Sequence, residues 1–185
     1  MPALKDKTVL IIGRGSGIAR SIALAVSEEG GGVIAAGLNP GDLADAYRGT
    51  DIGIEQVDVT DESSVAALAG RIARLDHVVS TASARARGGY ADLTADLVAA
   101  SFSTKVTGAL LLAKHFAGSL PPDGSFLFMS GATALKPAPG MLETQAASNQ
   151  NTDAATPVRR IVGAIVSSRL QAARQRRAHV MQAQA

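Results

Sequence analysis

The chain has 185 residues, enough for one domain with a sizeable hydrophobic core but too few for two comfortable ones. Apolar residues make up 46% of it and charged residues 18%, which excludes wholesale disorder, and the 3% of aromatic residues argues against a nucleic-acid binder that stacks bases. The absence of cysteine excludes disulfides and thiolate metal sites.

The net charge of +2 is unevenly distributed along the chain. All 16 acidic residues lie before residue 157, whereas residues 157–185 are rich in arginine and contain no acid. We therefore expect a globular domain over residues 1–156 and a basic C-terminal segment over residues 157–185. Because the N-terminus has no signal-peptide pattern and no apolar run reaches the roughly 18 residues of a membrane helix, we expect a cytoplasmic protein without a membrane partner.

Short apolar runs predict five strands in the first 130 residues, and stretches with helical periodicity lie between them. The expected strands are Thr8–Ile12, Gly32–Ala36, Ile52–Val57, His77–Ser80 and Ser125–Met129. The first helix is predicted from the spacing of Ile18, Ile22, Ala25 and Val26. Strands alternating with helices, several of them continuously apolar, predict a parallel sheet covered by helices on both faces.

Two further helices are predicted between the later strands. One begins at Asp61, where acidic residues suit the first turn of a helix. The other is a long helix over Leu93–Leu120, ended by the prolines that follow it. Past residue 140 the pattern weakens: Glu143–Thr156 fits a helix, and Ile161–Val166 fits either a sixth strand or the start of a basic helix.

A glycine-rich loop joins the first predicted strand to the first predicted helix. Its sequence is Gly13-Arg14-Gly15-Ser16-Gly17-Ile18. A glycine in such a turn permits positive φ, and a backbone without side chains lets a pyrophosphate approach the free N–H groups and positive dipole of the helix N-terminus. In this strand–turn–helix context we expect a dinucleotide cofactor to bind here, whereas the alternative is a purely structural turn.

The spacing of this loop resembles the Gly-x-x-x-Gly-Ile-Gly motif of the short-chain dehydrogenase/reductase family, with Ala19 at the last glycine. The resemblance continues from about residue 5 to residue 156. Asp58-Val59-Thr60 stands where the family places an aspartate beside the adenine ring, and Ser80-Thr81-Ala82-Ser83 replaces the family's Asn-Asn-Ala-Gly. Lys105-Val106-Thr107-Gly108 corresponds to the Asn-Val-x-Gly segment, and Ser130 to the catalytic serine.

This resemblance implies a three-layer, Rossmann-type, doubly wound parallel sheet, truncated relative to the family, and binding of NADP or NAD. The residues it assigns to the cofactor are Gly13, Arg14, Gly15, Ser16, Gly17, Ile18, Asp58, Val59 and Ala82. The second strand ends in Ala36-Gly37-Leu38-Asn39, with neither the acid that selects NAD nor the base that selects NADP. Arg14 could reach a 2′-phosphate, which favours NADP, although it is equally explained as a solvated charge.

The family's reaction is hydride transfer between the cofactor and a carbonyl or alcohol, with a tyrosine as general acid or base beside a lysine. At the corresponding positions this chain has Gln145 and Asn149, and neither exchanges a proton near neutral pH. Lys105 could substitute if desolvation lowered its pKa, while the plainer interpretation is a structural charge on a helix. The candidate catalytic residues are therefore Ser130 and Lys105.

Three hypotheses for the function remain. The first is an NAD(P)-dependent oxidoreductase of a small carbonyl or alcohol substrate. The second is a non-catalytic dinucleotide-binding protein that has lost the proton relay. The third is an interaction module that works through the basic segment, although nucleic acid is not expected as a partner. Because the fifth strand would be an exposed edge, we also expect it to pair with Arg160–Val166 or with a partner chain, as in a homo-oligomer.

Overall fold

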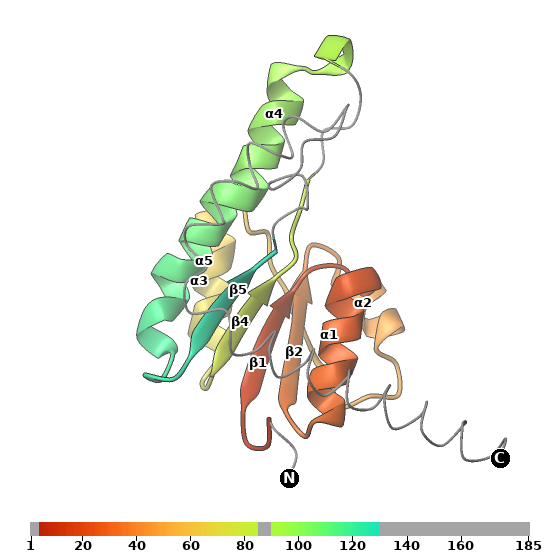
Figure 1. Ribbon diagram of the computed structural model, residues 1–185, viewed down its shortest axis with the longest axis vertical. Coiled ribbons are helices and arrows are strands. Elements are labelled where there is room, and N and C mark those ends of the chain that lie inside the picture. The colour runs from red at the N-terminus through yellow and green to blue at the C-terminus, as the bar shows by residue number, and fades with distance from the viewer. Residues whose placement is uncertain (1–3, 85–89, 130–185) are drawn as a thin grey trace, which may run out of the picture.

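The computed structural model describes residues 4–84 and 90–129 (Figure 1). Within these residues, five parallel strands form one sheet in the order β3-β2-β1-β4-β5. Their bounds are Thr8–Ile12 (β1), Gly32–Gly37 (β2), Gly53–Gln56 (β3), His77–Ser80 (β4) and Ser125–Phe128 (β5). All five predicted strands are confirmed. β1 and β4 are almost wholly buried, as apolar runs in a parallel sheet covered on both faces should be, whereas Gly53 and Gln56 of the edge strand β3 are exposed.

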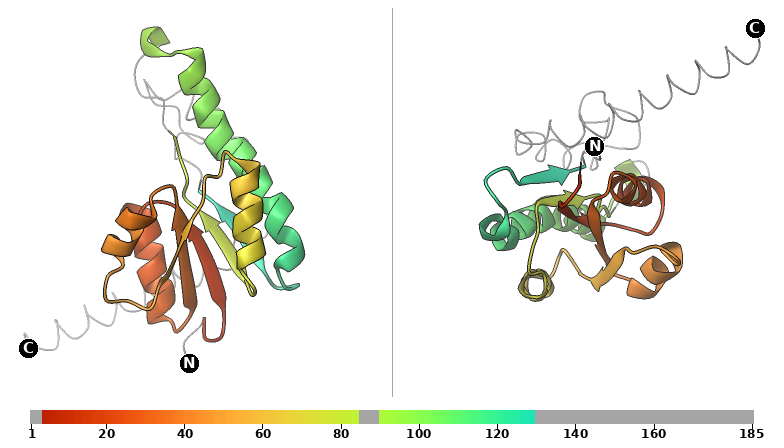
Figure 2. Two further views of the ribbon diagram at one scale, coloured as in Figure 1. Left: turned by 180° about the vertical axis from the view of Figure 1, so that it is seen from behind. Right: turned by 90° about the horizontal axis from the view of Figure 1, so that it is seen from below.

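Helices cover both faces of the sheet, so the fold has the three layers that the sequence predicts. The helix bounds are Gly17–Glu28 (α1), Pro40–Ala46 (α2), Glu62–Arg71 (α3), Ala95–Phe102 (α4) and Gly108–Phe116 (α5). One core cluster lies between the sheet and the first two helices, with Val26 and Leu43 fully enclosed. A second cluster lies under α3 and α5, which run side by side (Figure 2).

Of the residues whose spacing predicts α1, Ala25 and Val26 are buried, whereas Ile18 is exposed. The buried side chains of α1 are Ala19, Ala23, Ala25 and Val26. Ile18 is 57% exposed, because it stands in the first turn, beside the glycine-rich loop and away from the sheet. The small residues bring the helix axis close to β1 and β2, which fixes the position of the loop before the helix.

The predicted helix start at Asp61 is confirmed by a side-chain cap. Asp61 Oδ1 accepts a hydrogen bond from the backbone N–H of Ser63 at 2.9 Å, and Glu62 adds an acid to the first turn. Such a cap typically contributes about 1 kcal/mol. On the inner side of α3, Val65 and Leu68 are fully buried against the sheet.

The long predicted helix is continuous from Ala95 to Ser119, but it is not a regular α-helix throughout. Residues Ser103–Thr107 form a π-helical turn, in which the N–H of Gly108 donates to the carbonyl of Ser103. The first part of the helix projects beyond the carboxyl ends of the strands, and the second part packs on the sheet (Figure 1).

By length and composition this helix could cross a membrane, since it has 25 residues and a window of mean hydropathy 1.3. That finding runs against our expectation that no apolar segment of membrane length is present. However, Leu112 and Phe116 lie in the core between α5 and the sheet. The packing therefore accounts for much of the apolar character of the second half of the helix without a membrane.

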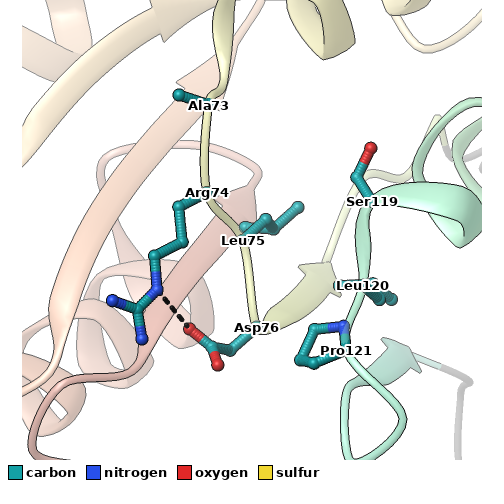
Figure 3. A pocket seen from close by; sticks show the side chains of 7 residues that line it. All are labelled: Ala73, Arg74, Leu75, Asp76, Ser119, Leu120 and Pro121. Carbon is teal, nitrogen blue, oxygen red and sulfur yellow. Dashed lines mark ion pairs between the residues drawn. The ribbon is translucent and has the colours of Figure 1, made fainter.

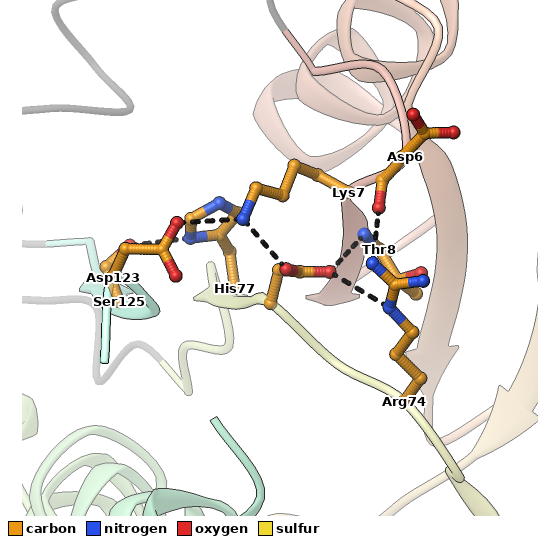
Figure 4. Close-up of polar contacts among 8 residues, drawn as sticks. Asp6, Lys7, Thr8, Arg74, His77, Asp123 and Ser125 are labelled. Atoms are coloured by element: carbon orange, nitrogen blue, oxygen red, sulfur yellow. Dashed lines mark hydrogen bonds and ion pairs between the residues drawn. The ribbon is translucent and has the colours of Figure 1, made fainter. Parts of the chain in front are cut away.

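Charged residues tie the amino ends of three strands together (Figure 4). The Asp76 carboxylate, 3% exposed, accepts hydrogen bonds from the Thr8 N–H at 2.9 Å and from Lys7 Nζ at 3.1 Å. Lys7 Nζ also donates to Asp123 Oδ2 at 2.8 Å, just before β5. Burial raises the pKa of Asp76, but the bonds from Thr8 and Lys7 outweigh burial and hold the pKa below its usual value.

Candidate functional site

The strand order places a topological switch point between β1 and β4. From β1 the chain moves to β2 and then β3 on one side, and from β4 it moves to β5 on the other. In open parallel sheets, ligands bind in the crevice outside the carboxyl ends of the strands at such a point. The glycine-rich loop follows β1 and residues 81–84 follow β4, so both segments lie at this crevice.

Gly13 fits closely between the ends of two neighbouring strands. A β-carbon on Gly13 would lie 2.2 Å from Thr81 Oγ1, and a β-carbon on Gly37 would lie 2.6 Å from the Gly13 carbonyl oxygen. The Gly13 N–H donates to the Ala36 carbonyl at 2.9 Å, and the Thr81 N–H donates to the Ile12 carbonyl at 2.8 Å. Thr81 and Gly37 thus shape the loop, a role that the sequence patterns did not reveal.

The loop ends at an open helix N-terminus. Ser16 is the N-cap of α1 in an extended conformation, but its side chain makes no capping hydrogen bond, and the first turn contains no acid. Gly17 has a φ of +57°, and nothing lies within 4 Å of the place a β-carbon would take. The first-turn N–H groups of α1 therefore face space that a phosphate group can fill.

The remaining loop residues differ in how they are placed. Gly15 packs against α2, because a β-carbon there would lie 2.4 Å from the Ala46 methyl group. Arg14 is exposed, as is Ile18, so neither side chain is used by the core. The close-packed glycines, the uncapped helix end and the exposed Arg14 and Ile18 fit a dinucleotide whose pyrophosphate lies at the start of α1.

The carboxyl end of β2 is where Rossmann folds discriminate between the two nicotinamide cofactors. Gly37 is buried, Leu38 is 69% exposed, and Asn39 is the N-cap of α2 without a side-chain capping bond. Leu38 and Asn39, which follow β2, are both uncharged, as the sequence indicates. A charge that selects the cofactor must come from elsewhere, and Arg14 in the neighbouring loop is the exposed cation of that loop.

Asp58 and Val59 lie just past β3, on the side expected for adenine. The Asp58 carboxylate is half-buried and accepts hydrogen bonds from Thr60 N–H at 2.8 Å and Thr60 Oγ1 at 2.7 Å. Val59 is 7% exposed and supports the long helix, since a β-carbon on Gly108 would lie 3.0 Å from Val59 Cγ2. Asp58 thus remains accessible to a ligand, while Val59 has a packing role.

Residues 80–83 form the wall of the crevice after β4. The Ala82 N–H lies 3.4 Å from Ser80 Oγ, and the Met129 N–H donates to the Ser80 carbonyl at 3.0 Å, which draws the chain after β5 toward the same edge. Ser83 Oγ is buried and has no hydrogen-bond partner among the residues that the structure describes. Ser130, the other predicted catalytic residue, lies outside the described residues, as do Gln145, Asn149 and residues 157–185.

Lys105 belongs to the π-helical turn and is only 7% exposed. Three residues later, the contact of Gly108 with Val59 fixes the helix at the carboxyl edge of the sheet. Because Lys105 precedes Gly108 by three residues, it lies about one turn beyond that edge. Short π-helical turns inside α-helices are often found at functional sites.

The other titratable candidates lie elsewhere. Tyr47 is 3% exposed in the core under α1 and α2, and burial raises its pKa. His77 begins β4 at the opposite end of the sheet, and His115 Nε2 contacts Glu62 Oε1 at 3.1 Å on the helical surface. Neither histidine reaches the crevice.

A cavity of about 320 Å³ opens at that opposite end (Figure 3). It is lined by Ala73, Arg74, Leu75, Asp76, Ser119, Leu120 and Pro121. The polar partners of the Asp76 carboxylate there are Lys7, Thr8 and Arg74. This cavity lies at the amino end of β4 and has no part in the crevice beside Gly13.

The chain matches the family model described as enoyl-(acyl carrier protein) reductase over residues 12–157. A solved short-chain type dehydrogenase/reductase from Mycobacterium ulcerans has a TM-score of 0.76 at 24% identity, covering 88% of this chain and 64% of that one. The Escherichia coli oxidoreductase yciK has a TM-score of 0.73 at 21% identity, with coverages of 80% and 67%. A short chain dehydrogenase from Mycobacterium smegmatis has a TM-score of 0.75 at 18% identity, with coverages of 81% and 67%.

No curated protein matches the chain. The solved structures share its fold, and the chain spans about two thirds of the length of the three named here. The matched segment starts at the last residue of β1 and so includes the whole glycine-rich loop.

Proposed function

Because this chain belongs to the short-chain dehydrogenase/reductase family, we propose that it is an NAD(P)-dependent oxidoreductase acting on a carbonyl or alcohol substrate. The observation that carries the proposal is the open start of α1, where Gly17 has positive φ and free space before it. That arrangement at the switch point of a parallel sheet is what a pyrophosphate requires.

The chain's own residues divide the binding of the dinucleotide among them. The loop Gly13–Gly17 and the first-turn N–H groups of α1 hold the pyrophosphate, with Ile18 against the cofactor. Asp58 serves the adenine side and Ala82 the nicotinamide side. When bound, the nicotinamide supplies or accepts the hydride.

We propose NADP rather than NAD as the cofactor. Arg14 is exposed in the loop, and no acid stands at Leu38 or Asn39 to hold a free ribose 2′-hydroxyl. A guanidinium pairs with a phosphate through parallel N–H groups, so Arg14 is suited to the 2′-phosphate.

For the chemical step we propose that Ser130 orients the substrate oxygen and that Lys105 transfers the proton. In reduction, the carbonyl carbon gains a hydride and its oxygen gains a proton, which the Lys105 ammonium gives up to become a neutral amine. The support for Lys105 is its burial on the π-helical turn at the carboxyl edge, where desolvation favours the neutral amine.

A second candidate function rests on the sequence after β5. If Gln145 and Asn149 occupy the positions of the family's tyrosine and lysine, the usual proton relay is lacking. The chain would then bind the dinucleotide without turning over a substrate. The non-catalytic protein and the oxidoreductase would bind the dinucleotide through the same loop. They differ only in whether Lys105 replaces the missing tyrosine and lysine in proton transfer.

We also propose that the protein is a homo-oligomer. Leu110 is 65% exposed and Leu97 is 40% exposed on the long helix, and within the described residues β5 is an edge strand. Exposed apolar side chains and an unpaired strand edge both favour association. Sedimentation of the full chain would show whether a dimer or larger assembly forms.

The experiment that tests the proposed function is a titration of the chain with NADPH and NADH, followed by a carbonyl panel. Binding with oxidation of the cofactor supports the oxidoreductase, and Lys105→Met should then abolish turnover with nearly unchanged cofactor affinity. Binding without oxidation favours the non-catalytic alternative. Failure to bind either cofactor contradicts both.

A further inference from the structure

Ser101 and Lys105 are the buried polar residues of the long helix. Ser101, in the last turn of α4, is 0% exposed, and Lys105, four residues later, is 7% exposed. Before Ser101, Leu97, Ala99 and Ala100 are exposed, and the three residues between Ser101 and Lys105 are half-buried. Residues four apart lie on one face of a helix, so the two polar side chains share the buried face.

The Ser101 hydroxyl is buried without compensation. Ser101 Oγ has no hydrogen-bond partner in the part of the chain that the structure describes. A nearby hydroxyl shows how easily the helix could have satisfied it, since Thr104 Oγ1 donates to the Ala100 carbonyl at 2.9 Å. Buried polar groups without partners are rare and destabilising, so the unpaired hydroxyl of Ser101 requires an explanation.

Helix geometry brings Lys105 toward this hydroxyl. Side chains on a helix lean toward its N-terminus and cover the preceding turn, which for Lys105 is the turn that contains Ser101. The π-helical turn Ser103–Thr107 lies immediately after that turn and carries Lys105 itself. The lysine side chain has a flexible four-carbon stem, so a change of rotamer can move its Nζ relative to that turn.

We propose that Ser101 is the positioning residue for Lys105, and that its hydroxyl accepts a hydrogen bond from the Lys105 ammonium in the cofactor-bound protein. This inference rests on the proposed function, in which Lys105 transfers the proton. After the ammonium has given up its proton, the same hydroxyl can donate to the neutral amine, since a serine O–H is both donor and acceptor. Ser101 thus holds the nitrogen in place through both protonation states.

The charged groups that the structure describes on the neighbouring elements either lie far from Lys105 along the helix or contact other residues. On α4, Asp96 is exposed in the first turn, more than two turns before Lys105. On α5, Lys114 and His115 both contact Glu62. Past β3, the Asp58 carboxylate accepts from Thr60. Removal of the Ser101 hydroxyl should therefore change the protonation of Lys105 without disturbing these groups.

The test is a titration of the lysine side chains by NMR in the full chain, with and without NADPH. The chain contains five lysines, and Lys105→Met assigns the Lys105 signal. A hydrogen bond accepted from an ammonium favours its charged form, so in the NADPH complex Ser101→Ala should lower the pKa of Lys105 by about one pH unit. Ser101→Thr, which keeps the hydroxyl, should restore most of the original value.

Ser103→Ala is the matched control, because it removes the same group from the same helix at a half-buried position. It should leave the pKa of Lys105 unchanged. If the proposed function holds, the alkaline limb of the kcat–pH profile should move to lower pH in Ser101→Ala by the same amount, since the reaction uses protonated Lys105.

The outcomes separate the two proposals. An equal pKa of Lys105 in the wild type and Ser101→Ala, with NADPH bound, overturns the role of Ser101 alone. Absence of NADPH binding overturns the proposed function and this inference together. Without NADPH, a lower thermal midpoint for Ser101→Ala would also contradict the role of Ser101, because loss of an unpaired buried hydroxyl should leave the cofactor-free protein at least as stable.

Discussion

Gly13 and Thr81 meet where β1 and β4 end: a β-carbon on the glycine would lie 2.2 Å from the threonine Oγ1. The Thr81 hydroxyl is fixed there because it donates to the Ile12 carbonyl at 3.2 Å. This contact closes one side of the crevice and leaves no room for a side chain at position 13. Both residues therefore limit what the loop can accommodate.

Gly13→Ala should destabilise the protein by about 1–3 kcal/mol, because the new methyl group must displace Thr81 Oγ1. Thr81→Ala should recover part of that loss in the double variant, although the Ala19 methyl group still lies 3.0 Å from the new β-carbon. Urea denaturation of the wild type, the two single variants and the double variant measures the coupling free energy between positions 13 and 81. Additive effects would mean that the two side chains do not compete for one space.

Gly17→Asp should abolish NADPH binding, whereas Gly17→Asn should retain part of it. Both substitutions place a similar side chain at a φ of +57°, and aspartate and asparagine tolerate that conformation better than most residues. They differ in the negative charge, which would repel a pyrophosphate at the start of α1. We expect about tenfold or more between their dissociation constants in a fluorescence titration with NADPH. Equal affinities would contradict the site.

The sheet was predictable because its strands are short runs rich in apolar residues, bounded by glycine and polar residues. The continuous helix after residue 93 was predictable for the same reason, since its periodicity persists across the π-helical turn. The turn itself was not, because an extra residue between Phe102 and Gly108 leaves no mark on the apolar pattern. The π-helical turn accompanies a tertiary contact, the close approach of Gly108 to Val59, which a local sequence pattern does not indicate.

Some residues of the candidate site could likewise be predicted from the sequence, and others could not. The glycines of the loop were identified from spacing, because close approach of a backbone demands that residue type. The helical periodicity alone could not show that Ile18 is exposed, since an apolar residue at a ligand site follows the same spacing as one that packs in the core. The unpaired Ser101 hydroxyl could not be found at all, because burial depends on what covers the helix.

Gly108→Ala and Gly70→Ala should change stability in opposite directions. Both glycines are helical, but the β-carbon at 108 would meet the Val59 side chain and carbonyl oxygen at 3.0–3.1 Å, while nothing lies within 4 Å at 70. We expect a loss of about 1–3 kcal/mol at 108 and a gain of about 0.5–1 kcal/mol at 70. Chemical denaturation checks both, and a neutral Gly108→Ala would show that the helix can move away from Val59.

Arg14→Met should weaken NADPH binding by about tenfold and leave NADH binding nearly unchanged, if Arg14 pairs with the 2′-phosphate. Arg20→Met is the control, because Arg20 is also an exposed arginine of the same region, with its Nε donating to the Ala46 carbonyl. Calorimetric titration of both variants and the wild type with both cofactors gives the ratio of dissociation constants, variant to wild type, for each variant and each cofactor. A parallel loss of NADPH and NADH in Arg14→Met would assign Arg14 to the pyrophosphate or to the loop.

Stability should fall below about pH 6.5 because of His77. The side chain is 8% exposed, and its Nδ1 lies 3.1 Å from Ser125 Oγ across β4 and β5. Burial lowers the pKa of His77 below its ordinary value of 6.5, and the Lys7 charge lowers it further, against the raising effect of Asp76 and Asp123.

The unfolded chain therefore takes up a proton at His77 that the folded protein resists. The contribution is complete above pH 6.5 and is lost as the pH falls from there toward the lower folded pKa. The nearby carboxylates Asp76 and Asp123 have lowered pKa values, so they titrate in a separate, more acidic range. Urea denaturation at pH 7.5 and pH 5.5 should show a larger loss of stability for the wild type than for His77→Gln. Equal losses would mean that His77 is protonated in the fold without penalty.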